Sequence, residues 1–224
     1  MSVFRVKQRR WQLTSLVLAL AATGMLHSPQ ALGACPAGTV TVSWTVVDGD
    51  DCQGVDLGTG AELFNEGIIS LGTDKDEAVE VTASATSLNN RKGASIIGSA
   101  SGGGVFGISL SIGAELGSLT NDGTIEGKDP ASVSSTFTTA IDNQGIIQNL
   151  TNNSQINGDI ATSSGSLGFF VNNGDVVGAV TYDGDESSPT LRNNAGASIR
   201  SAAIYASVIQ VTDSPFAVVS NAGI

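Results

Sequence analysis

Apolar, asparagine and glycine positions recur together along most of the chain, each on every second residue. Successive side chains of a β-strand point to opposite faces, so this period of two predicts that the recurring residues share one buried face of a sheet. The residues between them are small, polar or charged and belong to the other face. The four cleanest copies are Leu63-x-Asn65-x-Gly67-x-Ile69, Leu119-x-Asn121-x-Gly123-x-Ile125, Ile141-x-Asn143-x-Gly145-x-Ile147 and Phe170-x-Asn172-x-Gly174-x-Val176.

Further copies differ in length or in one residue. Two longer copies share the ending Gly-Ala-Ser-Ile, and in both an additional residue separates the asparagine from the glycine. A weaker copy has Ser154 where glycine is expected, and a last copy runs to the end of the sequence. These copies are Leu88-x-Asn90-x-x-Gly93 to Ile96, Leu191-x-Asn193-x-x-Gly196 to Ile199, Leu150-x-Asn152-x-Ser154-x-Ile156 and Val219-x-Asn221-x-Gly223.

The pattern predicts a strand, a tight bend and a second strand in each copy. Glycine adopts left-handed backbone conformations without a steric penalty and asparagine tolerates them, so we interpret each pair as a corner. Stacked coils of this kind lie ~4.8 Å apart and pair each strand with the coils above and below. The apolar residues then form a continuous inner column, and the asparagine side chains can bond one another along the axis.

The spacing of the asparagines agrees with a solenoid. Successive copies are separated by 25, 31, 22, 9, 20, 21 and 28 residues, and repeats of 20 to 50 residues are typical of such folds. The nine-residue step from Asn143 to Asn152 has two interpretations: they lie at different corners of one coil, or one is a coincidence. From the cleaner copies we expect Asn121, Asn143 and Asn172 at one corner of successive coils.

Composition supports an all-β fold. The chain has 28 glycines, 5% aromatic residues and 14% charged residues, which suits short strands and bends better than helices. We find no convincing amphipathic helix after residue 34.

The N-terminus has the organisation of a secretory signal peptide. Basic residues from Arg5 to Arg10 precede an apolar stretch from Leu13 to Leu26, and small residues at 31–33 fit a cleavage site. We expect cleavage near Gly33 or Ala34, and export through the inner membrane. An alternative is a lipobox, Leu32-Gly33-Ala34-Cys35, which would make Cys35 a lipidated N-terminal residue.

The only two cysteines, Cys35 and Cys52, are expected to pair in an oxidising compartment. A loop of this size contributes about 3 kcal/mol in the chain-entropy model. We predict that the bond holds the segment around Trp44 as a cap over the first coil.

The charge of the processed chain excludes several partners. Without residues 1–34, six basic residues remain against 21 acidic ones, a net charge of −15. Such a surface repels nucleic acid. The acidic clusters at 48–51, 74–77 and 183–186 match no EF-hand or calcium β-roll repeat, so we interpret them as exposed turns and expect no metal or cofactor.

Catalysis is restricted by the absence of histidine. His27, the only histidine, lies in the predicted signal peptide, so the processed chain has no Ser-His-Asp or Cys-His arrangement. Only carboxylate chemistry remains, and we find no acidic residue that recurs beside one of the few basic residues at coil spacing. We therefore predict no enzymatic activity. The alternative is a secreted carbohydrate-active β-helix enzyme with clustered carboxylates and a basic residue in one groove.

The repeats "LTNDGTIEG", "IDNQGIIQN", "FVNNGDVVG" and "LRNNAGASI" over residues 60 to 224 resemble the N-terminal part of a bacterial autotransporter passenger domain. The resemblance implies a right-handed parallel β-helix, exported through the outer membrane by a C-terminal β-barrel translocator outside this sequence. It also implies a structural scaffold or adhesin at the cell surface or secreted, with a host surface, extracellular matrix or glycan as partner. We expect the sequence to be part of a longer chain, since it stops inside a repeat.

These expectations divide the sequence into three parts. They are a signal peptide at 1–34, an N-terminal cap segment at 35–58 and parallel β-helix repeats at 59–224. Binding is expected along the flank of the rod or in loops such as Asp129 to Thr139.

Overall fold

The computed structural model describes the chain from the end of the predicted signal peptide onward, with gaps. The described residues are 31–32, 35–36, 38–72, 75–99, 105–128, 138–183, 189–200, 208–212 and 218–223. The basic and apolar parts of the predicted signal peptide lie outside them, as do residues 129–137, Asp74 and residues 184–186 of the predicted loops and clusters. In the described part no helix is long and apolar enough to cross a membrane.

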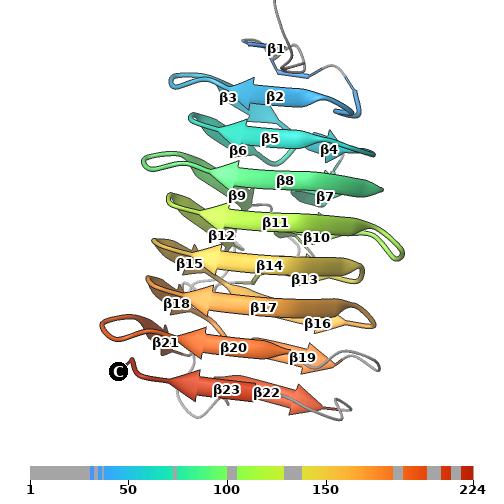
Figure 1. Cartoon of the computed structure of the whole chain (residues 1–224). Helices are drawn as coiled ribbons and strands as arrows, with labels where there is room; N and C mark the ends of the chain where they lie inside the picture. The colour runs from blue at the N-terminus through green and yellow to red at the C-terminus, as the bar shows by residue number, and fades with distance from the viewer. Residues whose placement is uncertain are drawn as a thin grey trace, which may run out of the picture.

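Three parallel sheets form the sides of one stack of coils, as the all-β solenoid prediction requires (Figure 1). The A sheet consists of β1 (Ala31–Leu32), β2 (Ser43–Val46), β5 (Glu62–Asn65), β8 (Ser84–Asn90), β11 (Glu115–Asn121), β14 (Ile146–Asn152), β17 (Ser166–Asn172), β20 (Thr190–Asn193) and β23 (Val218–Asn221). The C sheet consists of β3 (Asp51–Gln53), β6 (Ile68–Ser70), β9 (Ser95–Ser99), β12 (Thr124–Lys128), β15 (Gln155–Asn157), β18 (Asp175–Val177) and β21 (Ser198–Arg200). The B sheet consists of β4 (Val55–Leu57), β7 (Glu77–Val81), β10 (Phe106–Leu110), β13 (Thr139–Asn143), β16 (Asp159–Ser163), β19 (Val180–Asp183) and β22 (Ile209–Thr212).

Each coil passes through the A, C and B sheets in that order before the chain enters the next coil. In Figure 1 the A strands run leftward in front, the B strands run rightward behind, and the chain descends from one coil to the next. This combination of rotation and advance is right-handed. The fold is therefore a right-handed parallel β-helix.

Inward-facing residues of equivalent strands pair in register and form three apolar columns. A parallel register places identical positions one coil apart, so a repeat of similar residues fills the interior without gaps. After Cys52, the C column consists entirely of the β-branched residues Ile and Val, which suit a strand packed on one side. The columns are Trp44, Leu63, Leu88, Leu119, Leu150, Phe170, Leu191 and Val219 in the A sheet, Cys52, Ile69, Ile96, Ile125, Ile156, Val176 and Ile199 in the C sheet, and Val55, Val79, Ile108, Ile141, Ile160, Val180 and Ile209 in the B sheet.

The prediction that Asn143 shares a corner with Asn121 and Asn172 is wrong. Asn143 ends β13 in the B sheet, where it pairs with Leu110 and Thr162. The weaker copy supplies the missing corner, because Asn152 pairs with both Asn121 and Asn172 in the A sheet. The nine-residue step thus joins two different corners of the stack, the first of the two interpretations. The same period-two spacing occurs at both corners, so the sequence pattern does not separate them.

The predicted boundary between a cap and the repeats also needs correction. β2, β3 and β4 occupy the A, C and B sheets, so residues 43 to 57 already form a complete coil. The solenoid therefore begins before residue 59. This coil has Val46 where later coils have asparagine, which removed it from the repeat pattern. The short strand β1 pairs with β2 and covers one edge of this coil.

Candidate binding site

A continuous ladder of asparagine side chains, all buried except the last at Asn221, follows the corner between the A and C sheets. Each Nδ2 donates to the Oδ1 of the next asparagine toward the C-terminus, at 2.7 to 2.9 Å. Most also donate to a backbone oxygen of the next coil, as Asn90 does to Thr124 at 2.9 Å. Because these amides are buried, each bond satisfies a group that would otherwise be costly. The inner ladder consists of Asn65, Asn90, Asn121, Asn152, Asn172, Asn193 and Asn221.

The glycines of the short corners are required for a different reason from the one predicted. Neither these glycines nor the ladder asparagines have a left-handed backbone. Instead the coil above approaches closely: a Cβ on Gly174 would lie 2.0 Å from the Ser154 carbonyl oxygen, and one on Gly123 would lie 2.3 Å from that of Ala94. A side chain here would push neighbouring coils apart.

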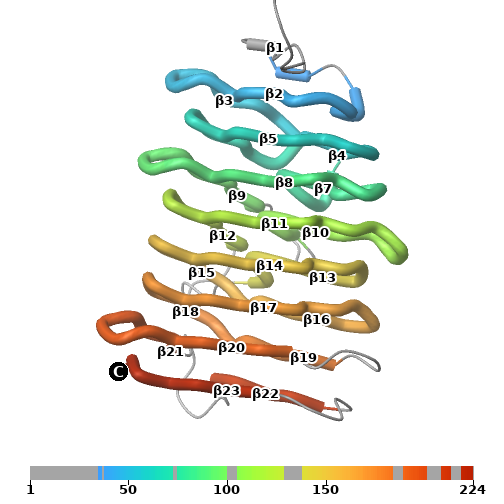
Figure 2. The backbone as a smooth tube through the Cα atoms, in the orientation of Figure 1, coloured from blue at the N-terminus to red at the C-terminus, as the bar shows by residue number. Residues whose placement is uncertain are grey.

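In the described part, the three long corners between the A and C sheets, at 47–50, 91–94 and 194–197, do use left-handed glycines. Gly93 has φ of 87° and Gly196 has φ of 84°, and open space surrounds the position of a Cβ at both. The connection from β8 to β9 spans residues 91–94, whereas the connections from β11 to β12 and from β14 to β15 have two residues each. In Figure 2 the β8–β9 connection accordingly reaches further outward than those of the coils above and below it.

A second amide ladder lies outside the first, on the exposed surface of the same corner. Asn153 Nδ2 donates to Asp122 Oδ1 at 2.8 Å, Asn173 Nδ2 donates to Asn153 Oδ1 at 2.7 Å, and Asn194 Nδ2 donates to Asn173 Oδ1. These bonds point toward the N-terminus, opposite to the inner ladder. The outer ladder consists of Asp122, Asn153, Asn173 and Asn194.

The difference in corner length produces a groove along this edge of the stack. The long corners of the β2 and β8 coils project above and below the short corner that contains Glu66. Between them lies a hollow of about 620 Å³, lined by Asp48, Glu66, Arg91, Lys92, Gly93 and Asp122.

A second hollow of about 440 Å³ lies below the projecting β8–β9 connection. Its other side is formed by the short corners at Asp122 and Asn153. The two hollows share Lys92, Gly93 and Asp122, and together we call them the corner groove.

Arg91 is held at the rim of the corner groove by two neighbours. Its guanidinium forms an ion pair with Glu66 from the adjacent coil, and it lies 5.1 Å from the centroid of the Phe64 ring. Such an ion pair between half-exposed groups adds little stability. The ring and the carboxylate nevertheless restrict the guanidinium, and those of its five N–H donors that do not bond Glu66 remain for other acceptors.

A separate carboxylate and lysine cluster lies on the outer face of the B sheet. Lys75 forms ion pairs with Asp56 and with Glu80, the latter at 3.4 Å, and Ser111 Oγ donates to Glu80 Oε1 at 3.1 Å. Burial alone would lower the pKa of Lys75, but the hydrogen bond to Asp56 and the charges of Asp56 and Glu80 raise it. Burial, followed by repulsion from Glu80, raises the pKa of Glu77.

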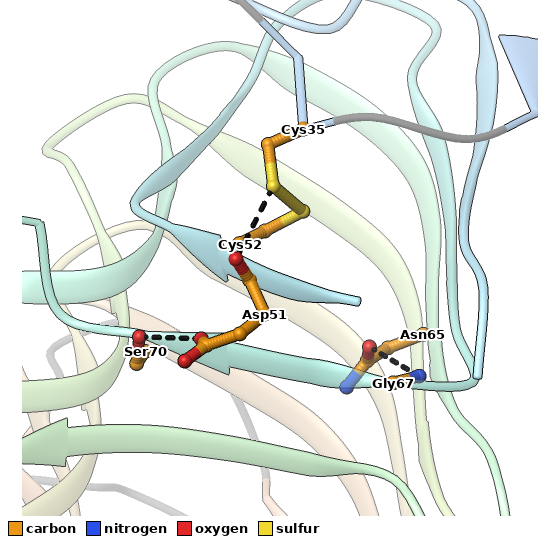
Figure 3. The surroundings of a disulfide bond; sticks show 6 residues. All are labelled: Cys35, Asp51, Cys52, Asn65, Gly67 and Ser70. Atoms are coloured by element: carbon orange, nitrogen blue, oxygen red, sulfur yellow. Dashed lines mark hydrogen bonds between the residues drawn. A yellow bond between two sulfur atoms is a disulfide. The ribbon is translucent and has the colours of Figure 1, made fainter. Parts of the chain in front are cut away.

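The disulfide between Cys35 and Cys52 is present as predicted (Figure 3). Cys52 is buried and pairs with Ile69, so the bond is attached to the first residue of the C column. Next to it, Ser70 Oγ donates to Asp51 Oδ1 at 2.8 Å. The bond therefore ties the chain before β2 to the apolar interior of the first coil.

The predicted site residues divide between two corners and two roles. Asn65, Asn90, Asn121, Asn172 and Asn193 join the inner ladder, whereas Asn143 and Gly145 lie between the B and A sheets. Asn143 is buried, and its Nδ2 donates to the Ser166 carbonyl at 2.9 Å. The corner groove was not predicted. The sequence copies differ in length, and this difference is the sequence feature from which a groove could have been expected.

No group of three or more histidine, cysteine, aspartate or glutamate side chains in the described part of the chain is arranged to hold a metal ion. Comparison with known proteins found no family model, no curated protein and no solved structure that matches the chain. The functional argument therefore depends on the geometry of the stack and on the residues at its surface.

Proposed function

We propose that this chain is the exported rod of a bacterial surface protein of the autotransporter passenger type, acting as a scaffold or adhesin without catalytic activity. The single observation that supports this most is the unbroken inner ladder, which locks successive coils into a long rigid stack. A stack in which each coil contacts only its neighbours can be extended without redesign, which suits a protein that displays binding surfaces at a distance from a cell.

Export is the first testable part of this proposal. The basic and apolar N-terminal segments favour it, and a disulfide fits an oxidising compartment better than the cytosol. Expression of the whole sequence in a Gram-negative bacterium, followed by fractionation and intact mass measurement, should yield a periplasmic chain that lacks about the first 34 residues.

Two other outcomes of the export experiment are informative. Retention of the complete sequence in the cytosol contradicts the proposal. An acyl mass on Cys35, with a free thiol at Cys52, would identify the lipoprotein alternative.

Adhesion is the second testable part. Beads coated with the oxidised chain should be retained on epithelial cells or on extracellular matrix more than beads coated with the same chain after irreversible unfolding. Equal retention of the two preparations would show that the folded surface does not bind.

A carbohydrate-active enzyme remains the second candidate, and a specific observation favours it. The corner groove brings three carboxylates, Asp48, Glu66 and Asp122, together with Arg91 and Lys92, as such an enzyme requires. The scaffold is preferred for two reasons. Arg91 is already paired with Glu66. In addition, burial raises the pKa of the Glu77 carboxyl group, but Glu77 lies on β7, outside the groove. A general acid of a glycosidase is expected to have a raised pKa.

Incubation of the chain with polyuronic and neutral polysaccharides separates the two candidates. An enzyme releases reducing or unsaturated ends above the blank, and this release is abolished by Asp122→Asn. A scaffold gives no release with any substrate.

A further inference from the structure

We propose that the corner groove binds a neutral saccharide, an inference that rests on the proposed adhesive function and names its ligand class. The hollows of about 620 and 440 Å³ fall within the range of small-ligand sites, roughly 300–1,000 Å³. They arise because a four-residue corner projects next to two-residue corners, so the groove belongs to the folded stack and to no single repeat.

The groove presents hydrogen-bond donors and acceptors side by side. Lys92 supplies N–H donors, Asp122 supplies carboxylate oxygens, and the exposed amide of Asn153 supplies both. Each hydroxyl group of a sugar is likewise a donor and an acceptor. A polyhydroxyl ligand can therefore pair with all three side chains without leaving a charged group unpaired.

The charge of the groove argues against an acidic polymer as its ligand. Asp48, Glu66 and Asp122 outnumber Arg91 and Lys92, and Glu66 already neutralises Arg91. A sulfated or sialylated glycan would bring further negative charge beside these carboxylates and beside a strongly acidic chain.

The position of the groove and its polar lining argue against a peptide as its ligand. Protein interfaces depend on aromatic or large apolar anchors in a desolvated centre, and the hollow below the β8–β9 connection has only Ala94, which is buried, as an apolar side chain. An added β-strand needs an open sheet edge, whereas the groove lies at a corner between two sheets whose strands are already paired on both sides. A neutral saccharide is the remaining class.

The experiment uses the oxidised, processed chain, labelled with biotin, on an array that holds neutral, sialylated and sulfated oligosaccharides. The best neutral ligand is then titrated by calorimetry against Asp122→Ala and Asn153→Ala. Asn194→Ala is the matched control, because it breaks the same kind of outer-ladder bond, to Asn173, without involving a side chain that lines the groove. Circular dichroism and thermal unfolding establish that each variant is folded.

We expect binding to neutral oligosaccharides that falls at least ~10-fold in Asp122→Ala and Asn153→Ala, as loss of a hydrogen bond in a site predicts, and that is unchanged in Asn194→Ala. Equal loss in all three variants, no loss in any, or preference for sulfated or sialylated glycans overturns the proposal. Retention of coated beads on cells without any array binding overturns the saccharide inference alone. If beads coated with the folded chain are retained no better than beads coated with the unfolded chain, the adhesive function itself is overturned.

Discussion

Two ladders of side-chain amides lie one residue apart along the A–C corner, and they differ in burial, in direction and in the backbone bonds that the inner amides add. Asn172 belongs to the inner ladder and its neighbour Asn173 to the outer one. The inner amide is fully buried and donates toward the C-terminus, and the outer amide is exposed and donates toward the N-terminus. Equal geometry therefore does not mean equal energy, because water can replace the partners of Asn173 and cannot reach those of Asn172.

The comparison applies to the whole coil, since each inward residue has an outward neighbour in the same strand. The largest effect is expected for Ile125→Asp, because Ile125 is fully buried in the C column and an unpaired buried carboxylate costs several kcal/mol. Neighbouring coils should lose their protease resistance and cooperative unfolding. The control is Thr124→Asp on the outward face, which should cost less than about 1 kcal/mol. Similar losses in both variants would show that the C column is not the core.

The second test compares the ladders directly. Asn172→Ala removes the donor to the buried Asn193 Oδ1 at 2.7 Å and to the partly buried Ser198 carbonyl at 3.0 Å, and leaves both acceptors without that bond. We expect a loss of about 3 kcal/mol in the free energy of unfolding by urea, against less than about 0.5 kcal/mol for Asn173→Ala. A difference smaller than the error of the extrapolation would mean that burial does not separate the two ladders.

The third test concerns the two kinds of corner. Gly174→Ala places a methyl group against the Ser154 carbonyl and should cost about 2 to 3 kcal/mol. Gly93→Ala places it in open space and costs about 1 kcal/mol through the left-handed backbone alone. Gly93→Asn should recover part of this loss, whereas Gly174→Asn should not. Recovery at both positions in urea unfolding would refute the steric explanation for the short corners.

The smallest effect is expected at Glu77. Because folding raises its pKa above the ordinary value of 4.5, the ionised carboxylate weakens the fold at neutral pH, and this penalty disappears below 4.5. Glu77→Gln should therefore stabilise the chain at pH 7 by less than about 0.5 kcal/mol, because the group is partly solvated, and should have no effect at pH 4. Thermal unfolding at both pH values measures this difference. Glu62→Gln on the A sheet is the control for removing one negative charge, and an equal gain there would assign the effect to net charge.

The alternation of apolar and polar positions was sufficient to predict the all-β solenoid and the corner asparagines. Local pattern reports which face a residue belongs to, but not which corner of a coil it occupies. Asn143 and Asn152 both end a strand with similar flanks, and only the pairing of whole strands assigns them to the B and A sheets. For the same reason the β2 coil was interpreted as a cap, since Val46 replaces the asparagine by which the other coils were recognised.

The corner groove could not be predicted from any one repeat. Its walls come from residues such as Asp48, Lys92 and Asn153, which are far apart in sequence and belong to different coils. The role of the short-corner glycines was missed for a related reason. Their constraint is the carbonyl of the coil above, not their own backbone conformation, and the sequence of one repeat does not contain that neighbour.

The direction of the two ladders has an electrostatic consequence. Amide groups aligned head to tail add their dipoles, as peptide groups do in a helix, so the outer ladder carries partial positive charge at the end where its N–H groups point. That end is the one nearest the N-terminus, and the residue that accepts the bond there is Asp122 instead of another asparagine. A carboxylate at this position neutralises the summed dipole, as an acidic residue does at the start of a helix, and the column can begin there without a partner above it.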